Sequence, residues 1–265
     1  MCRLRAAHFF IGGNMTLIAS DLDNTIIYSY KHNIGEDKRN VEIYEGREIS
    51  FITDHTYDLL QKIQKKCLLV PITTRSIQQY HRIDLQLGEM PYALTCNGGI
   101  LLENGEINRE WYEYSLQLIS ESQGDLQKAS LLLEDRQERY FEVRFIENLF
   151  VFTKCHEPEQ VVSDLKKQLN REFINVFHNG DKVYAVPNKL SKGVAVERLR
   201  KLFKPNKIIA AGDSEFDVSM VQAADLGIVP HGFKKEYNIE QETIQEASGQ
   251  RVFSEELLTM CLNEI

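Results

Sequence analysis

The stretch Ile18-Ala19-Ser20-Asp21-Leu22-Asp23-Asn24-Thr25 organises the interpretation of the whole chain. Its apolar start predicts a short buried strand that ends at Asp21 and Asp23, which are separated by one residue. Side chains two positions apart in an extended chain point the same way, so both carboxylates are expected on one side of the strand end. Neighbouring carboxylates repel each other unless a cation or a shared proton intervenes. The pattern therefore indicates a functional site, with an ordinary Asx-turn loop as the alternative.

Two further apolar runs also end in polar residues. Residues 67–72 are followed by Thr73-Thr74-Arg75, and residues 208–211 are followed by Gly212-Asp213. The carboxyl ends of the strands of an open parallel sheet line a ligand crevice, so these residues are expected beside Asp21. Between residues 100 and 186 the α/β alternation gives way to β-β-α signals, which predict an α+β insert.

Asp21, Asp23 and Thr25 resemble the first motif, D-x-D-x-T, of the haloacid dehalogenase superfamily of phosphohydrolases. The resemblance implies an α/β fold with a Rossmann-like parallel-sheet core and an inserted α+β cap domain, as in the Cof-type and sucrose-phosphatase-like branch. Residues 15–101 and 187–265 are then the catalytic core and residues 102–186 the cap. Residues 1–14 are interpreted as an N-terminal extension.

The other three motifs of the superfamily also have counterparts in the chain. Thr73 takes the threonine position of the second motif, Thr74 stands where close relatives usually carry glycine, and Arg75 is kept. Lys192, followed by glycine, resembles the phosphate-binding lysine of the third motif. The fourth motif, G-D-x-x-x-D, is matched by Gly212, Asp213 and Asp217.

The resemblance also implies the chemistry of these residues. Asp21 is the expected nucleophile and Asp23 the expected general acid and base, while Thr73, Thr74 and Lys192 bind the phosphate. Arg75 and Asn97 are weaker candidates for substrate contacts. Mg²⁺ is the expected cofactor, and its candidate ligands are Asp21, Asp23 through its main-chain carbonyl, Asp213 and Asp217.

Several of these residues also have a simpler interpretation. Thr73 can cap a strand, Lys192 can be a solvated surface lysine, and Asn97 can belong to an ordinary Asn-Gly turn. Asp217 can close a capping box with Ser214. Close relatives usually carry asparagine at the position of Phe216, so the usual substrate contacts are in doubt.

The expected function is Mg²⁺-dependent hydrolysis of a small phosphorylated metabolite, a sugar phosphate in first place, through an aspartyl-phosphate. The alternatives are a phosphomutase or phosphotransferase on the same scaffold, and a non-catalytic regulatory protein that binds a phosphorylated ligand. The net charge of −8 argues against nucleic-acid binding, and no apolar run is long enough to cross a membrane. Five scattered cysteines without a C-x-x-C pair favour the cytoplasm. The substrate and the oligomeric state are left open.

Overall fold

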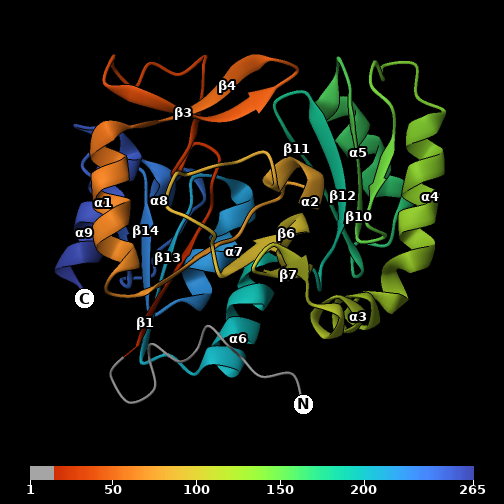
Figure 1. The fold of residues 1–265 in the computed structure, drawn as a ribbon. Helices are drawn as coiled ribbons and strands as arrows, with labels where there is room; N and C mark the ends of the chain where they lie inside the picture. The colour runs from red at the N-terminus through yellow and green to blue at the C-terminus, as the bar shows by residue number, and fades with distance from the viewer. Residues whose placement is uncertain (1–14) are drawn as a thin grey trace. The chain divides into compact units, whose positions relative to one another are not determined.

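The computed structural model describes residues 15–265, which form two compact units (Figure 1). Unit 1 comprises the described residues up to Ile107 together with Lys192–Ile265, and unit 2 comprises Asn108–Ser191. Unit 2 therefore begins and ends a few residues later than the insert expected at residues 102–186. The N-terminal extension proposed for residues 1–14 lies outside the described residues.

The core of unit 1 is a five-stranded sheet in which every pair of neighbours is parallel. The strand order is β15-β14-β13-β1-β5, so β1 lies between β13 and β5. This arrangement confirms the predicted Rossmann-like sheet. The strands are β1 (Thr16–Ser20), β5 (Leu68–Pro71), β13 (Lys207–Ala211), β14 (Leu226–Val229) and β15 (Ile244–Glu246).

Helices cover both faces of this sheet (Figure 1). On one face α1 (Asp54–Gln64) and α9 (Phe253–Asn263) pack together, and their apolar side chains form one buried cluster with Ile18 and Ile209 of the central strands. On the other side α6 (Lys192–Phe203) packs against α7 (Glu215–Ala223). Because central parallel strands are buried on both faces, they read as continuous apolar runs in the sequence.

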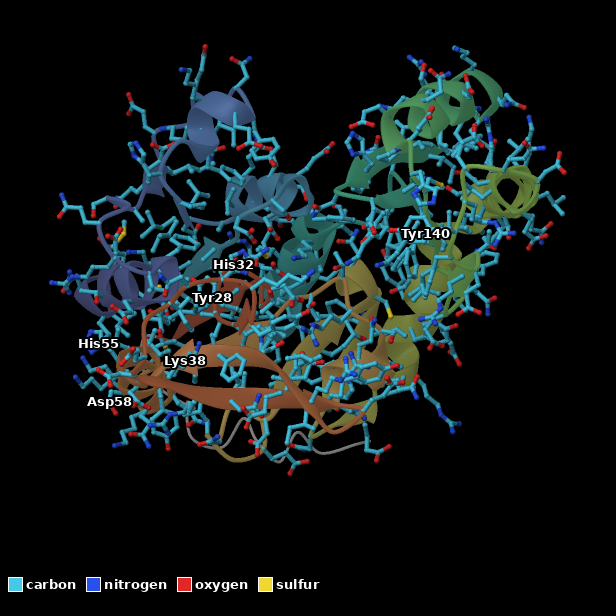
Figure 2. All side chains as sticks on the ribbon, turned by 90° about the horizontal axis from the view of Figure 1, so that it is seen from above. Tyr28, His32, Lys38, His55, Asp58 and Tyr140 are labelled. Atoms are coloured by element: carbon cyan, nitrogen blue, oxygen red, sulfur yellow. The ribbon has the colours of Figure 1, made fainter. Side chains whose placement is uncertain are left out.

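A small antiparallel sheet, called the flap here, follows the end of β1. It consists of β2 (Tyr28–Ser29), β3 (Lys38–Tyr44) and β4 (Arg47–Thr53), and the hairpin turns at Glu45 and Gly46, as the sequence predicts. Figure 2 labels Tyr28 and His32, whose rings pack edge to face with centroids 6.2 Å apart, and Lys38 at the start of β3. The flap thus starts within a few residues of Asp23.

The helical spacing of apolar residues after Ser76 predicts a helix that ends at Gly88, and this prediction is wrong beyond the first turn. Ser76 does close a capping box, but α2 covers only Ile77–Tyr80. The chain then runs beside the flap, where Ile83 forms a bridge with Glu42. Backbone pairing with β3 therefore prevails over the helical spacing of apolar residues. A second antiparallel sheet follows, made of β6 (Tyr92–Thr95), β7 (Ile100–Glu103) and β8 (Glu106–Ile107).

Unit 2 has the α+β character that the sequence predicts. Its four-stranded antiparallel sheet has the order β11-β12-β10-β9, and α4 and α5 contact its strands. The elements are α3 (Arg109–Leu118), α4 (Gln123–Glu134), β9 (Arg144–Ile146), β10 (Phe150–Lys154), α5 (Pro158–Gln168), β11 (Ile174–Asn179) and β12 (Lys182–Pro187). Among residues 15–265, no helix combines the length and apolarity needed to cross a membrane.

Candidate active site

Strand register brings the predicted motifs to one edge of the parallel sheet. Ser20, the last residue of β1, pairs with Ala211 of β13 on one side and with Pro71 of β5 on the other. The main-chain N–H of Asp21 then donates to the carbonyl of Ala211 at 2.8 Å. Asp21, the loop after β5 and the loop after β13 therefore leave the sheet side by side. Pro71 is tolerated because β5 is an edge strand of this sheet.

Lys192, at the start of α6, is the buried cation of the site. Its Nζ lies 2.6 Å from Asp21 Oδ1 and 2.6 Å from Asp217 Oδ1, and only 1% of the residue is exposed. Burial alone would lower the pKa of Lys192, but the two carboxylates outweigh it and raise that pKa above its ordinary value. Lys192 is therefore a charged, fixed group in this structure rather than a solvated surface lysine.

Asp217 uses both of its oxygens to hold the loop and the lysine. Oδ1 accepts from Lys192, while Oδ2 accepts from the N–H groups of Asp213 and Ser214 and from the Ser214 hydroxyl at 2.9 to 3.1 Å. The capping box with Ser214 is thus present. Gly212 allows this close approach, since a Cβ there would lie 2.3 Å from the Asp217 side chain. Asp217 consequently serves the site by orienting Lys192 and the loop.

Asp213 completes a cluster of carboxylates. Its Oδ1 accepts a hydrogen bond from Thr25 Oγ1 at 3.0 Å. Burial, together with the charge of Asp217, raises the pKa of Asp213 to about 6. Burial also raises the pKa of Asp21 well above its ordinary range, against the opposing effect of Lys192. Asp21, Asp213 and Asp217 offer oxygen atoms that all lie within 4.8 Å of one another.

The residues of this cluster suit a divalent metal ion. Three carboxylates and one ammonium group leave a formal charge of −2, which a divalent cation would balance. Magnesium prefers oxygen ligands and keeps several waters, so it needs only one or two carboxylates from the protein. Asp21 and Asp213 are the better donors, because both oxygens of Asp217 already accept hydrogen bonds.

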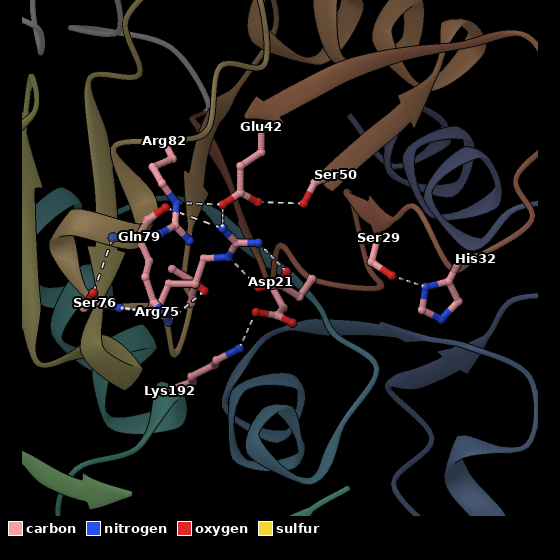
Figure 3. A network of polar contacts seen from close by, with 12 residues as sticks. Asp21, Ser29, His32, Glu42, Ser50, Arg75, Ser76, Gln79, Arg82 and Lys192 are labelled. Atoms are coloured by element: carbon pink, nitrogen blue, oxygen red, sulfur yellow. Dashed lines mark hydrogen bonds and ion pairs between the residues drawn. The ribbon is translucent and has the colours of Figure 1, made fainter. Parts of the chain in front are cut away.

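Asp23 lies apart from the lysine and pairs with Arg75. Arg75 Nε donates to Asp23 Oδ2 at 2.8 Å and Arg75 Nη2 donates to Asp23 Oδ1 at 2.7 Å. Such two-pronged pairs fix a carboxylate in orientation as well as position. Asp21 and Asp23 therefore have separate cationic partners, Lys192 for the first (Figure 3) and Arg75 for the second.

The remaining predicted residues lie in the turn after β5 and, for Asn97, in the turn after β6 that contacts it. Thr73 is fully buried and its Oγ1 accepts from the Arg75 N–H at 3.1 Å, which is the capping arrangement considered above. The N–H of Asn97 donates to the carbonyl of Thr73 at 2.9 Å, and Asn97 adopts a left-handed conformation with φ of 59°. Thr74 is half-buried. The structure thus gathers Thr73, Thr74, Arg75 and Asn97 next to one another.

Comparison with known families finds a match over part of the chain. Residues 108–230 match the family described as haloacid dehalogenase-like hydrolases, and this range contains Lys192, Asp213 and Asp217. The chain is similar to these hydrolases over that range. No curated protein matches it.

Solved structures share the fold of this chain at low sequence identity. The sucrose-phosphatase of Synechocystis sp. PCC6803, solved with sucrose and phosphate, has a TM-score of 0.65 and 15% identity, over 95% of this chain and 97% of that one. The trehalose-6-phosphate phosphatase of Aspergillus fumigatus has a TM-score of 0.54 and 12% identity, over 94% and 93%. A haloacid dehalogenase-like hydrolase of B. subtilis has a TM-score of 0.57 and 15% identity, over 92% and 99%.

Two charged residues beside the site, Glu42 and Arg82, were not predicted from the sequence. Glu42 of the flap is 1% exposed and forms ion pairs with Arg75 and Arg82. Glu42 and Arg82 lie outside the four motifs. Alternation along β3 predicts that the side chain of Glu42, directly after the apolar Val41, faces solvent. The only available signal was a hairpin that follows closely after the first motif.

Proposed function

We propose that this chain is a haloacid dehalogenase-like hydrolase, a Mg²⁺-dependent phosphatase that releases phosphate from a small phosphorylated metabolite, in the first place a sugar phosphate. The observation that carries the proposal is the buried cluster of Asp21, Asp213 and Asp217 around Lys192, with a formal charge left for a divalent ion. The sugar-phosphate class is supported by the two sugar-phosphate phosphatases that share the fold. Free, buried thiols at four cysteines favour the cytoplasm as its location.

Asp21 and Asp213 would hold the metal ion, together with the main-chain carbonyl of Asp23. The bound ion would supply positive charge that offsets the repulsion between the carboxylates and the substrate phosphate. Lys192, Thr73 and Thr74 would bind the remaining phosphate oxygens. Because Lys192 occupies only Oδ1 of Asp21, it orients this carboxylate and leaves the second oxygen as the nucleophile.

The reaction then proceeds in two displacements at phosphorus. Asp21 attacks phosphorus, the bond to the leaving oxygen breaks, and Asp23 gives that oxygen a proton. An aspartyl-phosphate forms on Asp21. Asp23 next takes a proton from water, the water oxygen attacks phosphorus, and inorganic phosphate leaves as Asp21 is regenerated. Unit 2 would act as the cap that reads the leaving group.

The test is release of inorganic phosphate from a panel of phosphorylated sugars and nucleotides, with Mg²⁺ and after chelation. We expect release that requires Mg²⁺, and its loss by at least about 10³-fold in Asp21→Asn, because the covalent route needs this carboxylate. Asp58→Asn, an exposed aspartate of α1 (Figure 2), is the matched control and should retain full activity. Full turnover in Asp21→Asn would contradict the mechanism. Transfer to a second sugar without free phosphate would indicate a phosphotransferase instead.

A further inference from the structure

Glu42 is a carboxylate that the local strand pattern places inside the molecule against expectation. In β3 the regular pairing with β4 shifts twice, between Asn40 and Glu42 and again between Glu42 and Ile43, so that the two shifts cancel. At this irregular, bulged pairing Val41 and Glu42 are both buried, at 2% and 1% exposure. Bulges commonly redirect a side chain next to a functional site. Burying an ionised carboxylate is unfavourable unless it is paired and hydrogen-bonded.

The Glu42 carboxylate is paired on both of its oxygens (Figure 3). Oε2 accepts from the Ser50 hydroxyl at 2.6 Å, while Oε1 lies 2.8 Å from Arg75 Nη1 and 3.0 Å from Arg82 Nε. Burial opposes its ionisation, but the hydrogen bonds from Arg75 and Ser50 prevail and hold the pKa of Glu42 below its usual value. Glu42 is therefore an ionised anchor carried by the flap.

Arg75 joins this anchor to the catalytic aspartate. Its Nε and Nη2 both donate to Asp23, and its Nη1 faces Glu42 and the carbonyl of Gln79. The guanidinium is planar and rigid, so fixing one edge on Glu42 fixes the direction in which the other edge presents its N–H groups. With most of its donors engaged, Arg75 is better suited to orient Asp23 than to bind substrate.

We propose that Glu42 is a positioning residue that sets the orientation of Asp23 through Arg75, and so ties the flap to proton transfer at the leaving oxygen. The inference rests on the proposed function, because it gives Asp23 the role of acid. Charge is balanced along the chain of contacts: Asp23 and Glu42 are negative, while Arg75 and Arg82 are positive. The role predicts a selective defect, since only leaving groups that need a proton depend on the placement of Asp23.

The test compares two substrates in Glu42→Gln, which keeps the shape of the side chain and removes its charge. One substrate is the best sugar phosphate of the panel, whose alkoxide needs a proton; the other is p-nitrophenyl phosphate, whose phenolate leaves without one. We expect kcat/KM for the sugar phosphate to fall about tenfold or more while that for the aryl phosphate falls less than about threefold. KM for the sugar phosphate should change little, since Glu42 does not contact phosphate-binding groups. Glu48→Gln, an exposed glutamate of the same hairpin, is the matched control.

Arg75→Lys provides the second variant, because it keeps the positive charge but loses the planar guanidinium whose two N–H groups donate to Asp23. It should show the same selective loss, and Glu42→Gln should add nothing further in the Arg75→Lys background. Thermal unfolding of each variant checks that it is folded; if Glu42→Gln is not, Ser50→Ala replaces it, since this change removes only one donor to Glu42.

Each of the following outcomes would overturn the inference. An equal loss for both substrates would show that Glu42 only supports the fold, and additive losses in the double variant would show that it does not act through Arg75. A wild-type protein that hydrolyses neither substrate would refute the proposed function and this inference with it. A wild type active on both, with an unselective Glu42→Gln, would refute the inference alone.

Discussion

Lys192 stands at a helix start, where the helix dipole disfavours a cation. The site overcomes this local preference with two ion pairs of 2.6 Å to buried carboxylates. The lysine also relieves repulsion, because Asp21 and Asp217 would otherwise face each other unpaired. Its ion pairs are therefore structural, and the proposed function adds a role in binding phosphate.

Lys192→Met should destabilise the metal-free protein by about 3 to 5 kcal/mol, since it leaves two buried carboxylates without their cation. Phosphate release should fall at the same time by at least about a hundredfold, because the charge facing the transferred group is gone. Urea unfolding and the phosphatase assay measure the two effects. Lys201→Met on the exposed side of α6 is the control, and a Lys192→Met protein as stable as this control would contradict the buried pair.

The convergence of Asp21 and Asp213 was predictable from sequence because two simple rules apply to it, whereas the place of Lys192 beside them was implied by the family resemblance alone. Apolar runs marked the strands, and parallel strands bring the residues that follow them to one edge. Glu42 was not predictable, since a bulge breaks the period on which such reasoning depends. The pairing of Asp23 with Arg75 depends on side-chain directions that spacing along the chain does not encode.

At the scale of the elements, α6 and α7 approach closely where Gly193 faces Ser219. The Gly193 N–H donates to Ser219 Oγ at 3.1 Å, and a Cβ on Gly193 would lie 2.4 Å from the Ser219 carbonyl oxygen. The two helices carry Lys192 and Asp217, so their separation sets the length of the ion pair between them. This is a structural reason for glycine directly after the lysine.

Gly193→Ala should destabilise the protein by about 1 to 3 kcal/mol, because the added methyl group forces the two helices apart. Activity should fall with it, since the Lys192–Asp217 contact is stretched. Gly124→Ala is the matched control: it also lies in a helix, has open space around its Cα, and should be neutral or stabilising by up to about 1 kcal/mol. Equal stability of the two alanine variants would show that α6 and α7 can shift without loss.

The elements themselves were mostly predictable, with α2 as the instructive exception. Ile77, Tyr80, Ile83 and Leu87 have helical spacing, yet the helix ends at Tyr80. The following backbone pairs with the flap instead, as the hydrogen bond from the Asp84 N–H to the Val41 carbonyl shows. Periodicity along a short segment does not report such a long-range partner, and tertiary contacts override it.

The molecule as a whole carries a net charge of −8, and its active site likewise holds more carboxylates than cationic groups. Burial raises the pKa of Asp213 to about 6 from 3.8. A carboxyl group with a raised folded-state pKa favours folding below its unfolded pKa, and this contribution is lost as the pH rises through the folded value. The metal-free protein therefore holds unfavourable carboxylate charge at neutral pH, which a divalent cation would relieve.

Asp213→Asn should be more stable than the wild type by on the order of 1 kcal/mol at about pH 8 without divalent cations, and the difference should shrink towards zero near pH 4. Denaturant unfolding over this pH range, in the presence of a chelator, measures the difference. Adding Mg²⁺ near pH 8 should raise the unfolding midpoint of the wild type and leave Asp213→Asn nearly unchanged. A pH-independent difference between the two proteins would contradict the raised pKa.

The irregular pairing in β3 makes the flap sensitive to chain length as well as to residue type. Because the register with β4 is the same before and after Glu42, removing Val41 alone would slip one strand by one residue against the other and turn the carboxylate away from both arginines. In related chains, deletion of one residue at this point of the hairpin would therefore indicate that the contact between the flap carboxylate and Arg75, and with it the positioning of Asp23, has been lost. This would hold even where all four motifs are intact. Insertions and deletions in this hairpin would then be more informative about divergence of this site than substitutions are.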